Sequence, residues 1–355
     1  MPSKPTSDTQ PYAAAVAATR REFLAAALGT AGALATNCMQ AGESPAMPQP
    51  SASLGPAETA SLRIGVPPTC DPAFFLAEPY LREEGFTDIQ FVKGNASQAM
   101  AGGGADLSSL FPPSLAAEVD AGNPVVAVAG LHVGCIGLFA QKGTRDVRAL
   151  RGKTVFVPSK DPRDFRYSFF VVTLLEAGID PMREVDIVEA PAGADLVQMF
   201  RDGKSEAVMV ATQTMDKLRA DGGFEMLVDY ATDAPWSGHH CCLLTATRSF
   251  LDMRPNAARR AVRAILRGNI DAPTDLARGV QSMVDRGVTK DYDGVLAHDR
   301  TLPYDTWRTV DPEVGLRFFA ERLQRANAIK SSADEIVRKG TDWNALRQAK
   351  RELKA

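Results

Sequence analysis

The sequence predicts an α/β protein in which mostly parallel sheets are covered by helices on both faces. Three observations lead to this fold class. Short apolar segments alternate with helical segments through residues 61–230, as in chains of strand–helix units. Residues 124–131 form a continuous apolar run, which is typical of a strand buried on both faces. From Asn256 onward the pattern is mainly helical, so the tail adds helices to the sheets that precede it.

The first series of elements is expected between residues 61 and 131. Apolar alternation or continuous apolar runs predict strands at 61–66, 88–92, 105–111 and 124–131. Helical patterns between them predict helices at 71–85, 97–101 and 113–121. Asp71 precedes Pro72, and this pair predicts a helix start with an acidic cap and proline at the first position.

The second series is expected between residues 135 and 230. It consists of strands at 135–141, 153–157, 184–189, 207–211 and 224–230. Helices are expected between them at 169–177, 194–201 and 214–220. In the tail, helices are expected at 256–270 behind an Asn256 cap, and at 274–286, 312–326 and 332–339.

Length and composition narrow the classes of function. A chain of 355 residues favours two lobes. With 40 basic and 43 acidic residues the formal net charge is −3, so the chain has no basic excess with which to bind nucleic acid. Five cysteines are too few for a disulfide scaffold. Mean hydropathy is −0.14, and no long apolar run follows the N-terminal region, so the mature chain is not expected to span a membrane.

Residues 1–37 are predicted to be a twin-arginine signal peptide. Arg20 and Arg21 precede an alanine-rich apolar segment at 25–35. Residues 33–35 fit the A-x-A pattern of ordinary signal peptidase, whereas 35–38 resemble a lipobox in which Cys38 would carry a lipid. Residues 38–60 are rich in Pro, Ser, Ala and Gly and are expected to form a flexible spacer. The prediction is an exported periplasmic protein, with lipid anchoring through Cys38 and free release as alternatives.

Several short segments of the body occur in the order and spacing of a known family. They are Pro68-Thr69-Cys70, 74–78, 84–87, Gly104-Ala105-Asp106-Leu107, 120–124, 150–158, Pro235-Trp236-Ser237, 330–332 and 340–343. With these segments the chain resembles the periplasmic substrate-binding proteins of ABC transporters, in the nitrate, sulfonate, taurine and thiamine-pyrimidine-precursor group. The resemblance covers residues 61–355.

The resemblance implies the two-lobe type II periplasmic-binding-protein fold, an α/β fold with mixed, mostly parallel sheets and two crossing strands. The crossings are expected near residues 137–143 and 241–245. The implied lobes are 61–139 with 243–355, and 140–242. The implied function is capture of a small organic ligand, anionic or aromatic, in the cleft between the lobes for import. An inner-membrane ABC permease is the implied partner, and the protein is expected to be a monomer that binds no nucleic acid.

Candidate ligand-binding residues lie where the general rule for α/β sheets and the resemblance agree. In such sheets ligands bind beyond the carboxyl ends of strands, near helix N-termini. The residues selected there are Thr69, Cys70, Asn95, Phe111 and Thr212. Purely structural roles compete with binding: turn packing for Thr69 and Cys70, helix capping for Asn95 and core packing for Phe111.

The loop 159–167 departs most from the family pattern, because it holds three cations, two acids and two aromatic residues. Ser159, Lys160 and Arg163 are its candidates for recognising an anionic or polar ligand. The alternative is a solvated loop whose charges cancel. Trp236, just before the return crossing, offers a flat apolar face to an aromatic ligand.

His239-His240-Cys241-Cys242 contains residue types that bind transition metals. Neighbours on a strand point to opposite faces, so these four residues alone cannot close a tetrahedral site. The sequence therefore predicts no metal site and no cofactor, with the cysteines packed as small apolar residues. His239, and His132 near the first crossing, are retained as candidates to line the cleft.

Two other functions stay open as alternatives. The first is an enzyme on the same fold, either metal-dependent or similar to the pyrimidine synthases that are related to this family. The sequence has none of the G-x-S-x-G, Walker or G-x-G-x-x-G motifs, so no enzyme is predicted. The second is a sensor that presents its ligand-bound form to a receptor. It would use the same cleft, and only its partner would differ.

Overall fold

The structure is a computed structural model that describes residues 54–66 and 71–354. The predicted signal peptide, Cys38 and most of the predicted spacer lie outside the described residues, as do Thr69 and Cys70. The described residues belong to one unit, 53–355.

A five-stranded sheet organises the first part of this unit, which we call lobe I. Its strand order is β2-β1-β3-β10-β4. The strands are β1 (Ser61–Val66), β2 (Asp88–Lys93), β3 (Leu107–Leu110), β4 (Val125–Gly130) and β10 (Leu243–Thr247). β1 pairs in parallel with β2 and β3, whereas β10 runs antiparallel between β3 and β4. The four strands expected before residue 131 are confirmed, and the last strand of the sheet comes from the returning chain.

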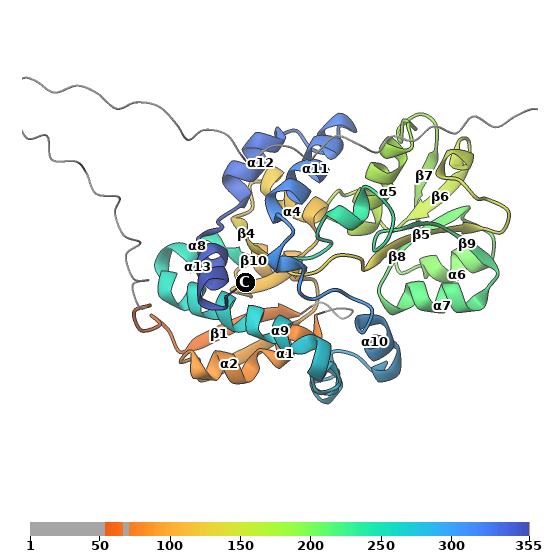
Figure 1. The fold of residues 1–355 in the computed structure, drawn as a ribbon. Coiled ribbons are helices and arrows are strands. Elements are labelled where there is room, and N and C mark those ends of the chain that lie inside the picture. The colour runs from red at the N-terminus through yellow and green to blue at the C-terminus, as the bar shows by residue number, and fades with distance from the viewer. Residues whose placement is uncertain (1–53, 67–70, 355) are drawn as a thin grey trace, which may run out of the picture. The chain divides into compact units, whose positions relative to one another are not determined.

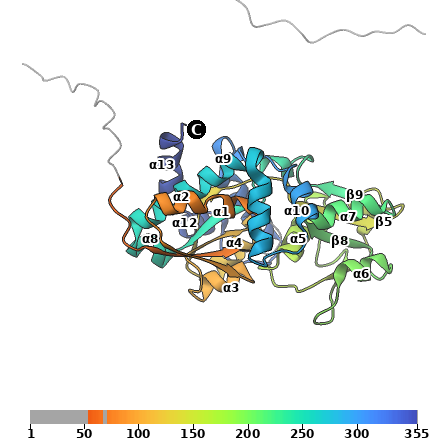
Figure 2. The same cartoon turned by 90° about the horizontal axis from the view of Figure 1, so that it is seen from below.

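Helices cover both faces of this sheet, with α1 and α9 on one side and α3 on the other (Figure 2). The lobe I helices are α1 (Pro72–Leu76), α2 (Glu78–Glu83), α3 (Ala96–Ala101), α4 (Pro112–Asp120), α8 (Arg248–Met253), α9 (Pro255–Asp285), α10 (Tyr292–Asp299), α11 (Pro312–Arg325), α12 (Ala333–Gly340) and α13 (Asn344–Glu352). The single helix expected at 71–85 is split at Ala77. The two helices expected at 256–270 and 274–286 are one helix, α9, with non-helical backbone at Asp275, two residues after Pro273.

Lobe II is built around β5 (Ile136–Gln141), which enters directly from lobe I. β5 is the middle strand of a three-stranded sheet, β8-β5-β9, and is antiparallel to both neighbours. The other strands are β6 (Thr154–Val157), β7 (Asp186–Glu189), β8 (Ala207–Ala211) and β9 (Phe224–Asp229), and β6 pairs with β7 in parallel. The alternation of strands and helices suggested parallel pairing, but β5 runs against its neighbours because it is a crossing strand.

Three helices complete lobe II: α5 (Phe165–Glu176), α6 (Leu196–Arg201) and α7 (Gln213–Asp221). α5 begins four residues before the start expected at 169, because Asp164 caps it by accepting a hydrogen bond from the backbone N–H of Arg166. Figure 1 shows β5 to β9 and α5 to α7 gathered apart from the strands of lobe I. The lobe boundaries at 139/140 and 242/243 stay a prediction.

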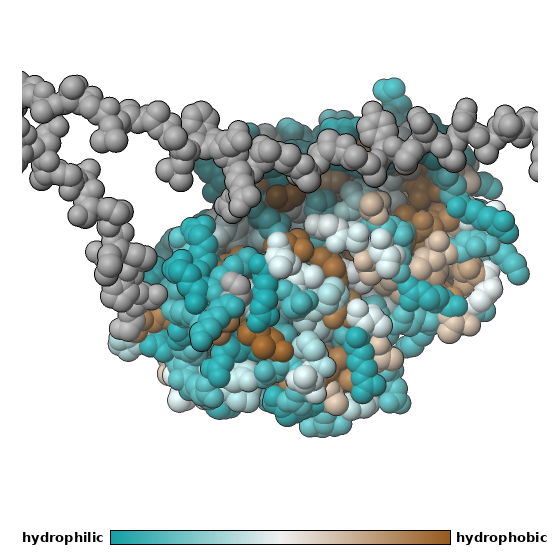
Figure 3. Space-filling model, viewed as in Figure 1, coloured by the Kyte–Doolittle hydropathy of each residue, from teal (hydrophilic) through white to brown (hydrophobic). Residues whose placement is uncertain are grey.

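The described helices include none that is both long enough and apolar enough to cross a membrane. The face drawn in Figure 3 is mainly hydrophilic, with apolar side chains showing in places between the polar ones. The large apolar side chains that are exposed come from separate elements or loops: Met182, Met253, Ile270 and Val314. These scattered residues do not form a docking surface.

Close packing of α1 against α9 anchors the first helix of lobe I. A Cβ at Gly268 of α9 would lie 2.3 Å from the carbonyl oxygen of Ala73 in α1. A Cβ at Gly279, three turns later, would lie 2.7 Å from the carbonyl oxygen of Pro72. Both glycines are therefore required by the approach of two backbones, since no side chain fits between them.

We predict that Gly268→Ala destabilises the protein. Overpacking against backbone atoms costs up to about 3 kcal/mol, more than the gain of about 1 kcal/mol that alanine brings to a helix. The free energy of unfolding by chemical denaturation measures the change. The matched control is Gly223→Ala, whose Cβ would meet its nearest atom only at 4.0 Å. Equal stability of both variants would contradict the packing argument.

Candidate ligand-binding site

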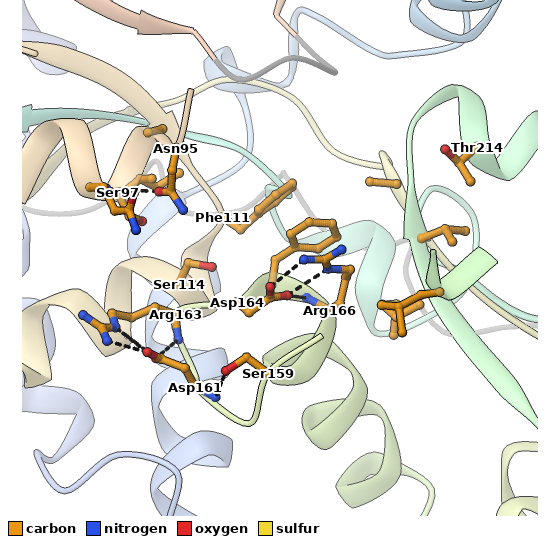
Figure 4. Close-up of a pocket in the computed structure, with 18 of the residues that line it drawn as sticks. Asn95, Ser97, Phe111, Ser114, Ser159, Asp161, Arg163, Asp164, Arg166 and Thr214 are labelled. Atoms are coloured by element: carbon orange, nitrogen blue, oxygen red, sulfur yellow. Dashed lines mark hydrogen bonds and ion pairs between the residues drawn. The ribbon is translucent and has the colours of Figure 1, made fainter. Parts of the chain in front are cut away.

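A cavity of about 850 Å³ lies between the two lobes and is the main candidate site (Figure 4). Lobe I lines it with the start of α3, the end of β3, and Ser114 and Glu118 of α4. Lobe II lines it with the loop from β6 to α5, the start of α6, strand β8 and Thr214 of α7. The cavity therefore lies beyond strand ends and at helix starts, where ligands of open α/β sheets bind.

The lobe I wall presents small polar groups and one aromatic ring. Asn95 caps α3 by accepting a hydrogen bond from the backbone N–H of Gln98 at 3.0 Å. Ser109 and Phe111 lie at the end of β3, and Ser114 follows one turn into α4. The capping role and the cavity position of Asn95 thus coexist, because the side-chain oxygen caps the helix while the residue still lines the cavity.

Two aromatic rings from different lobes meet in the cavity. The ring centroids of Phe111 and Phe165 lie 4.7 Å apart with the rings inclined by 38°. Phe169 packs edge-on against Phe111 at 5.7 Å. Both cavity-lining rings are half-buried, so part of their surface remains available to a ligand. Together Phe111 and Phe165 form an apolar wall of the cavity, and each lobe contributes one of its two rings.

The charged loop before α5 pairs its charges internally. Arg163 forms an ion pair with Asp161, and Arg166 lies 2.7 Å from Asp164. Figure 4 shows each arginine turned toward the aspartate that precedes it. These ion pairs and hydrogen bonds lower the pKa of Asp161 and raise that of Arg163. This loop was expected either to recognise an anionic or polar ligand or to be a solvated loop whose charges cancel. The internal ion pairs favour the second interpretation.

Further carboxylates face the cavity from both lobes. Asp195 caps α6 by accepting hydrogen bonds from the N–H groups of Val197 and Gln198, each at 3.0 Å. Glu118 of α4 is 2% exposed and accepts a hydrogen bond from Asn123. Four carboxylates and two guanidinium groups line the cavity among the described residues. The described lining is therefore acidic, and its helix N–H groups at α5 and α6 are already bonded to carboxylates.

The structure places four of the sequence candidates in the cavity: Asn95, Phe111, Ser159 and Arg163. It places five others elsewhere: His132, Lys160, Thr212, Trp236 and His239. Thr69 and Cys70 lie outside the described residues.

The described candidates outside the cavity make other contacts or are buried elsewhere. Lys160 is exposed, and its backbone N–H donates to Glu189 at 2.6 Å. Thr212 is fully buried with φ of 53°, so it holds a left-handed backbone between β8 and α7. Trp236 is 4% exposed and packs on Tyr230 with ring centroids 4.4 Å apart. His239 stacks on Phe318 at 4.3 Å.

Sequence reasoning missed several cavity residues. Phe165 and Arg166 belong to the segment 159–167, from which the sequence analysis selected Ser159, Lys160 and Arg163 instead. Asp195 follows a strand and begins a helix, so the strand-end rule could have found it. Glu118 lies nearly two turns into α4. It follows no strand end, so the strand-end rule could not select it.

A cluster of buried polar groups adjoins the cavity at Ser109 and Cys242. The Ser109 hydroxyl donates to Asp71, whose other oxygen lies 3.1 Å from Nε2 of His132. Nδ1 of His132 lies 3.3 Å from Sγ of Cys241. Asp71 thus does not cap α1 as expected, because its carboxylate is engaged by Ser109 and His132 and its φ is 73°.

Burial and neighbouring charges shift the pKa values of His132 and Cys241 in opposite directions. Burial favours the neutral imidazole, but the charges of Cys241 and Asp71 and their hydrogen bonds raise the pKa of His132 well above its ordinary value. Burial likewise favours the neutral thiol, but hydrogen bonds with Cys135 and Cys242 and the His132 charge lower the pKa of Cys241. Nearby, burial lowers the pKa of His240 to about 4, which keeps that ring neutral.

Comparison with known families assigns the chain. The family model described as NMT1/THI5 like matches residues 78–275, which is more than half of the chain. The chain belongs to the NMT1/THI5-like family. The predicted resemblance is thereby confirmed at the level of the family, and no curated protein matches the sequence significantly.

Solved structures show that this NMT1/THI5-like chain has the fold of periplasmic binding proteins. The nitrate-binding protein NrtA from Synechocystis PCC 6803 is similar with a TM-score of 0.68 and 15% identity, over 84% of this chain and 90% of its own. The alkanesulfonate-binding protein SsuA from Xanthomonas axonopodis pv. citri has a TM-score of 0.64 and 16% identity, over 81% and 99%. The desulfurization enzyme DSZB has a TM-score of 0.56 and 13% identity, over 82% and 99%. The expected fold class is confirmed.

Contacts between α10 and α7 join the lobes beside the cavity. Nδ1 of His298 lies 2.8 Å from Asp216, and Nζ of Lys217 lies 2.7 Å from Asp291. His298 is buried, and its Nε2 has no hydrogen-bond partner among the described residues. Burial therefore lowers the pKa of His298, despite the hydrogen bond to Asp216 that raises it.

We predict that His298 makes the protein less stable on acidification. The folded-state pKa is lowered, so below the ordinary value of about 6.5 the unfolded chain takes up the proton more readily than the folded one. Stability contributed by the neutral ring is present above that pH and is lost below it. The melting-temperature difference between wild type and His298→Gln should therefore shrink from pH 7.5 to pH 5. The other histidines are common to both proteins and cancel; an unchanged difference would contradict the prediction.

Proposed function

We propose that the protein is an extracytoplasmic solute-binding protein that captures a small organic ligand between its two lobes. The observation that carries the proposal is the cavity of about 850 Å³, because both lobes contribute polar and aromatic groups to its lining. A volume of this size suits a small molecule. Family membership and the fold shared with nitrate- and sulfonate-binding proteins support the same function.

For the ligand class, we favour an aromatic molecule that is neutral or positively charged. Phe111 and Phe165 offer a ring-sized apolar wall, and aromatic rings stack on such surfaces. The two arginines of the described lining are already paired with aspartates, and Asp164 and Asp195 bond the helix N–H groups that an anion would use. An inorganic anion such as nitrate would have to displace these carboxylates, at a cost in binding free energy.

Ligand capture would proceed through closure of the lobes. A ligand that touches both lobes binds the closed form better than the open one, and this difference in affinity drives closure. Contacts between the lobes support the closed form: His298 with Asp216 in one place, and Arg322 of α11 with Glu176 of α5 at 2.6 Å in another. No covalent chemistry is needed, and the proposal includes no enzyme activity.

The proposal extends to location and partners. The protein would act in the periplasm as a monomer and deliver its ligand to an inner-membrane ABC permease. Export by the twin-arginine route rests on Arg20 and Arg21, and lipid anchoring on Cys38, all outside the described residues. A sensor role would use the same cleft and is distinguished by its partner.

We predict that a thermal-shift screen identifies a selective aromatic ligand. The panel contains nitrate, an alkanesulfonate, an aromatic carboxylate and an aminopyrimidine, each added to chain refolded from denaturant to remove copurified ligand. Ligand at 100 times its dissociation constant adds about 2.7 kcal/mol of stability. Stabilisation by the aminopyrimidine, but not by nitrate, the alkanesulfonate or the aromatic carboxylate, is the expected result. Selective stabilisation by either organic anion would contradict the proposed ligand charge. Selective stabilisation by nitrate would overturn the proposed ligand class.

We predict that Phe111→Ala weakens binding of the identified ligand roughly tenfold, since an aromatic contact contributes about 0.5–1.5 kcal/mol beyond its buried area. Calorimetric titration measures the dissociation constants. Phe224→Ala is the matched control, because Phe224 is also half-buried but packs on Phe200 in lobe II, away from the cavity lining. Equal losses in both variants would point to general destabilisation and contradict a direct role for Phe111.

A further inference from the structure

Three cysteines and one histidine converge in the core where the two lobes are joined. His132 and Cys135 lie on the connection from β4 to β5, and Cys241 and Cys242 lie just before β10. Their potential ligand atoms all lie within 4.8 Å of one another, and all four residues are buried. The sequence prediction judged His239–Cys242 by itself and considered His132 only as a candidate to line the cleft. It therefore did not join the two distant segments into one set.

We propose that His132, Cys135, Cys241 and Cys242 form a mononuclear binding site for a thiophilic divalent metal ion, Zn²⁺ being the ion that fits best. Three thiolates and one imidazole are a ligand set of structural zinc sites, and sulfur ligands select soft ions over magnesium or calcium. The site goes beyond the proposed solute-binding function and does not depend on it.

Three of the distances between ligand atoms are close to those of a tetrahedral ion. With metal–sulfur bonds of about 2.3 Å, two thiolates of a tetrahedral site lie about 3.8 Å apart. Sγ of Cys242 lies 3.8 Å from that of Cys241 and 3.7 Å from that of Cys135. Nδ1 of His132 lies 3.3 Å from Sγ of Cys241, near the roughly 3.5 Å expected for a nitrogen–sulfur edge.

One edge of the set is shorter than the others. Sγ of Cys135 lies 2.7 Å from Sγ of Cys241. This distance is longer than a disulfide bond of about 2.05 Å and shorter than the edge of a zinc site. Metal binding would therefore increase the distance between these two sulfurs by about 1 Å. A disulfide between them is therefore the competing state, and the experiment must distinguish the two.

Residues around the ligands form the support that metal sites require. Metal-bound histidines usually donate their other ring N–H to a carboxylate, which fixes the ring and its tautomer. Asp71 lies 3.1 Å from Nε2 of His132, which leaves Nδ1 for the metal. Ser109 in turn holds Asp71, and the backbone N–H of Cys241 donates to the carbonyl oxygen of His132 at 3.0 Å.

The backbone of Asp71 adopts a conformation that fits this support. Its φ of 73° places a residue other than glycine in the left-handed region, a conformation that costs on the order of 1–3 kcal/mol. Such strain persists where the surroundings demand one orientation of a side chain. Here that orientation brings the carboxylate between Ser109 and His132, where it serves the histidine and not the helix.

Metal binding would release to solvent the protons of the thiols and the proton on Nδ1 of His132, and would place a cation among the buried ligand groups. The ion would join the two connections between the lobes directly, and Cys242 would place it next to the ligand cavity. With all four positions supplied by the protein, it would be a structural ion with no open position.

The test uses the full chain, reduced and stripped of metal with a chelator, then titrated with Co²⁺ and Zn²⁺. We expect one ion per chain by elemental analysis, thiolate-to-cobalt absorption bands of tetrahedral geometry, and loss of these bands when Zn²⁺ is added. Absence of cobalt–thiolate bands in the reduced protein would overturn the proposal. A Cys135–Cys241 disulfide with no metal uptake after reduction, or iron bound with inorganic sulfide, would overturn it too.

Variants assign the ligands. Cys241→Ser should abolish the cobalt–thiolate bands or weaken metal binding by more than 100-fold. Asp71→Asn should weaken binding by about 10- to 100-fold while the band pattern is retained, as for other residues that orient a ligand. His239→Gln is the matched control and should bind as wild type, because His239 stacks on Phe318. If Cys241→Ser fails to fold, the cobalt spectrum of the wild-type chain still decides.

Discussion

The contact between the two connections that join the lobes is the constraint on which the rest of the structure depends. β10 is inserted antiparallel between β3 and β4, so the returning chain must run beside the segment that leaves β4. The backbone N–H of Leu131 donates to the carbonyl oxygen of Cys242, and that of Cys241 donates to His132, both at 3.0 Å. A Cβ at Gly134, where φ is 87°, would lie 2.6 Å from the Cβ of Ala231. The two connections are therefore packed so closely that no side chain fits at Gly134.

This close contact determines where ligand-binding groups can meet. It places the end of β3 opposite the start of α5, so that Phe111 and Phe165 come into contact although they belong to different sheets. The same contact brings Cys135 against Cys241 in the floor between the lobes. Cavity and cysteine cluster are thus two consequences of one topological feature. A chain that returned along the outer edge of the sheet would form neither.

The sequence alone predicted most strands and helices, because apolar periodicity and capping residues are local signals. Asn95 and Asp164 show how such signals succeed and fail: both cap helices in the structure, but the second was overlooked and α5 was predicted to start too late. The position of β10 and the antiparallel pairing of β5 depend on contacts far apart in the sequence, which no local pattern contains. The same distinction holds for the site residues. Asn95 and Phe111 lie at strand ends and could be predicted from the sequence, whereas Glu118 lines the cavity from within a helix and could not.

The cysteine cluster illustrates the limit of local reasoning most clearly. Adjacent residues on a strand cannot surround an ion, and that argument about His239–Cys242 remains correct. It does not cover the cluster in the structure, because Cys135 and His132, 106 and 109 positions before Cys241, lie beside it. The cost of burying polar and charged groups bears on the role of this cluster. A buried carboxylate, an imidazole and thiol groups in an apolar core are costly unless paired, and evolution can replace them by apolar residues at little loss of stability. Their presence at the junction of the lobes, with Asp71 strained to serve His132, therefore favours a functional role for the cluster over simple packing.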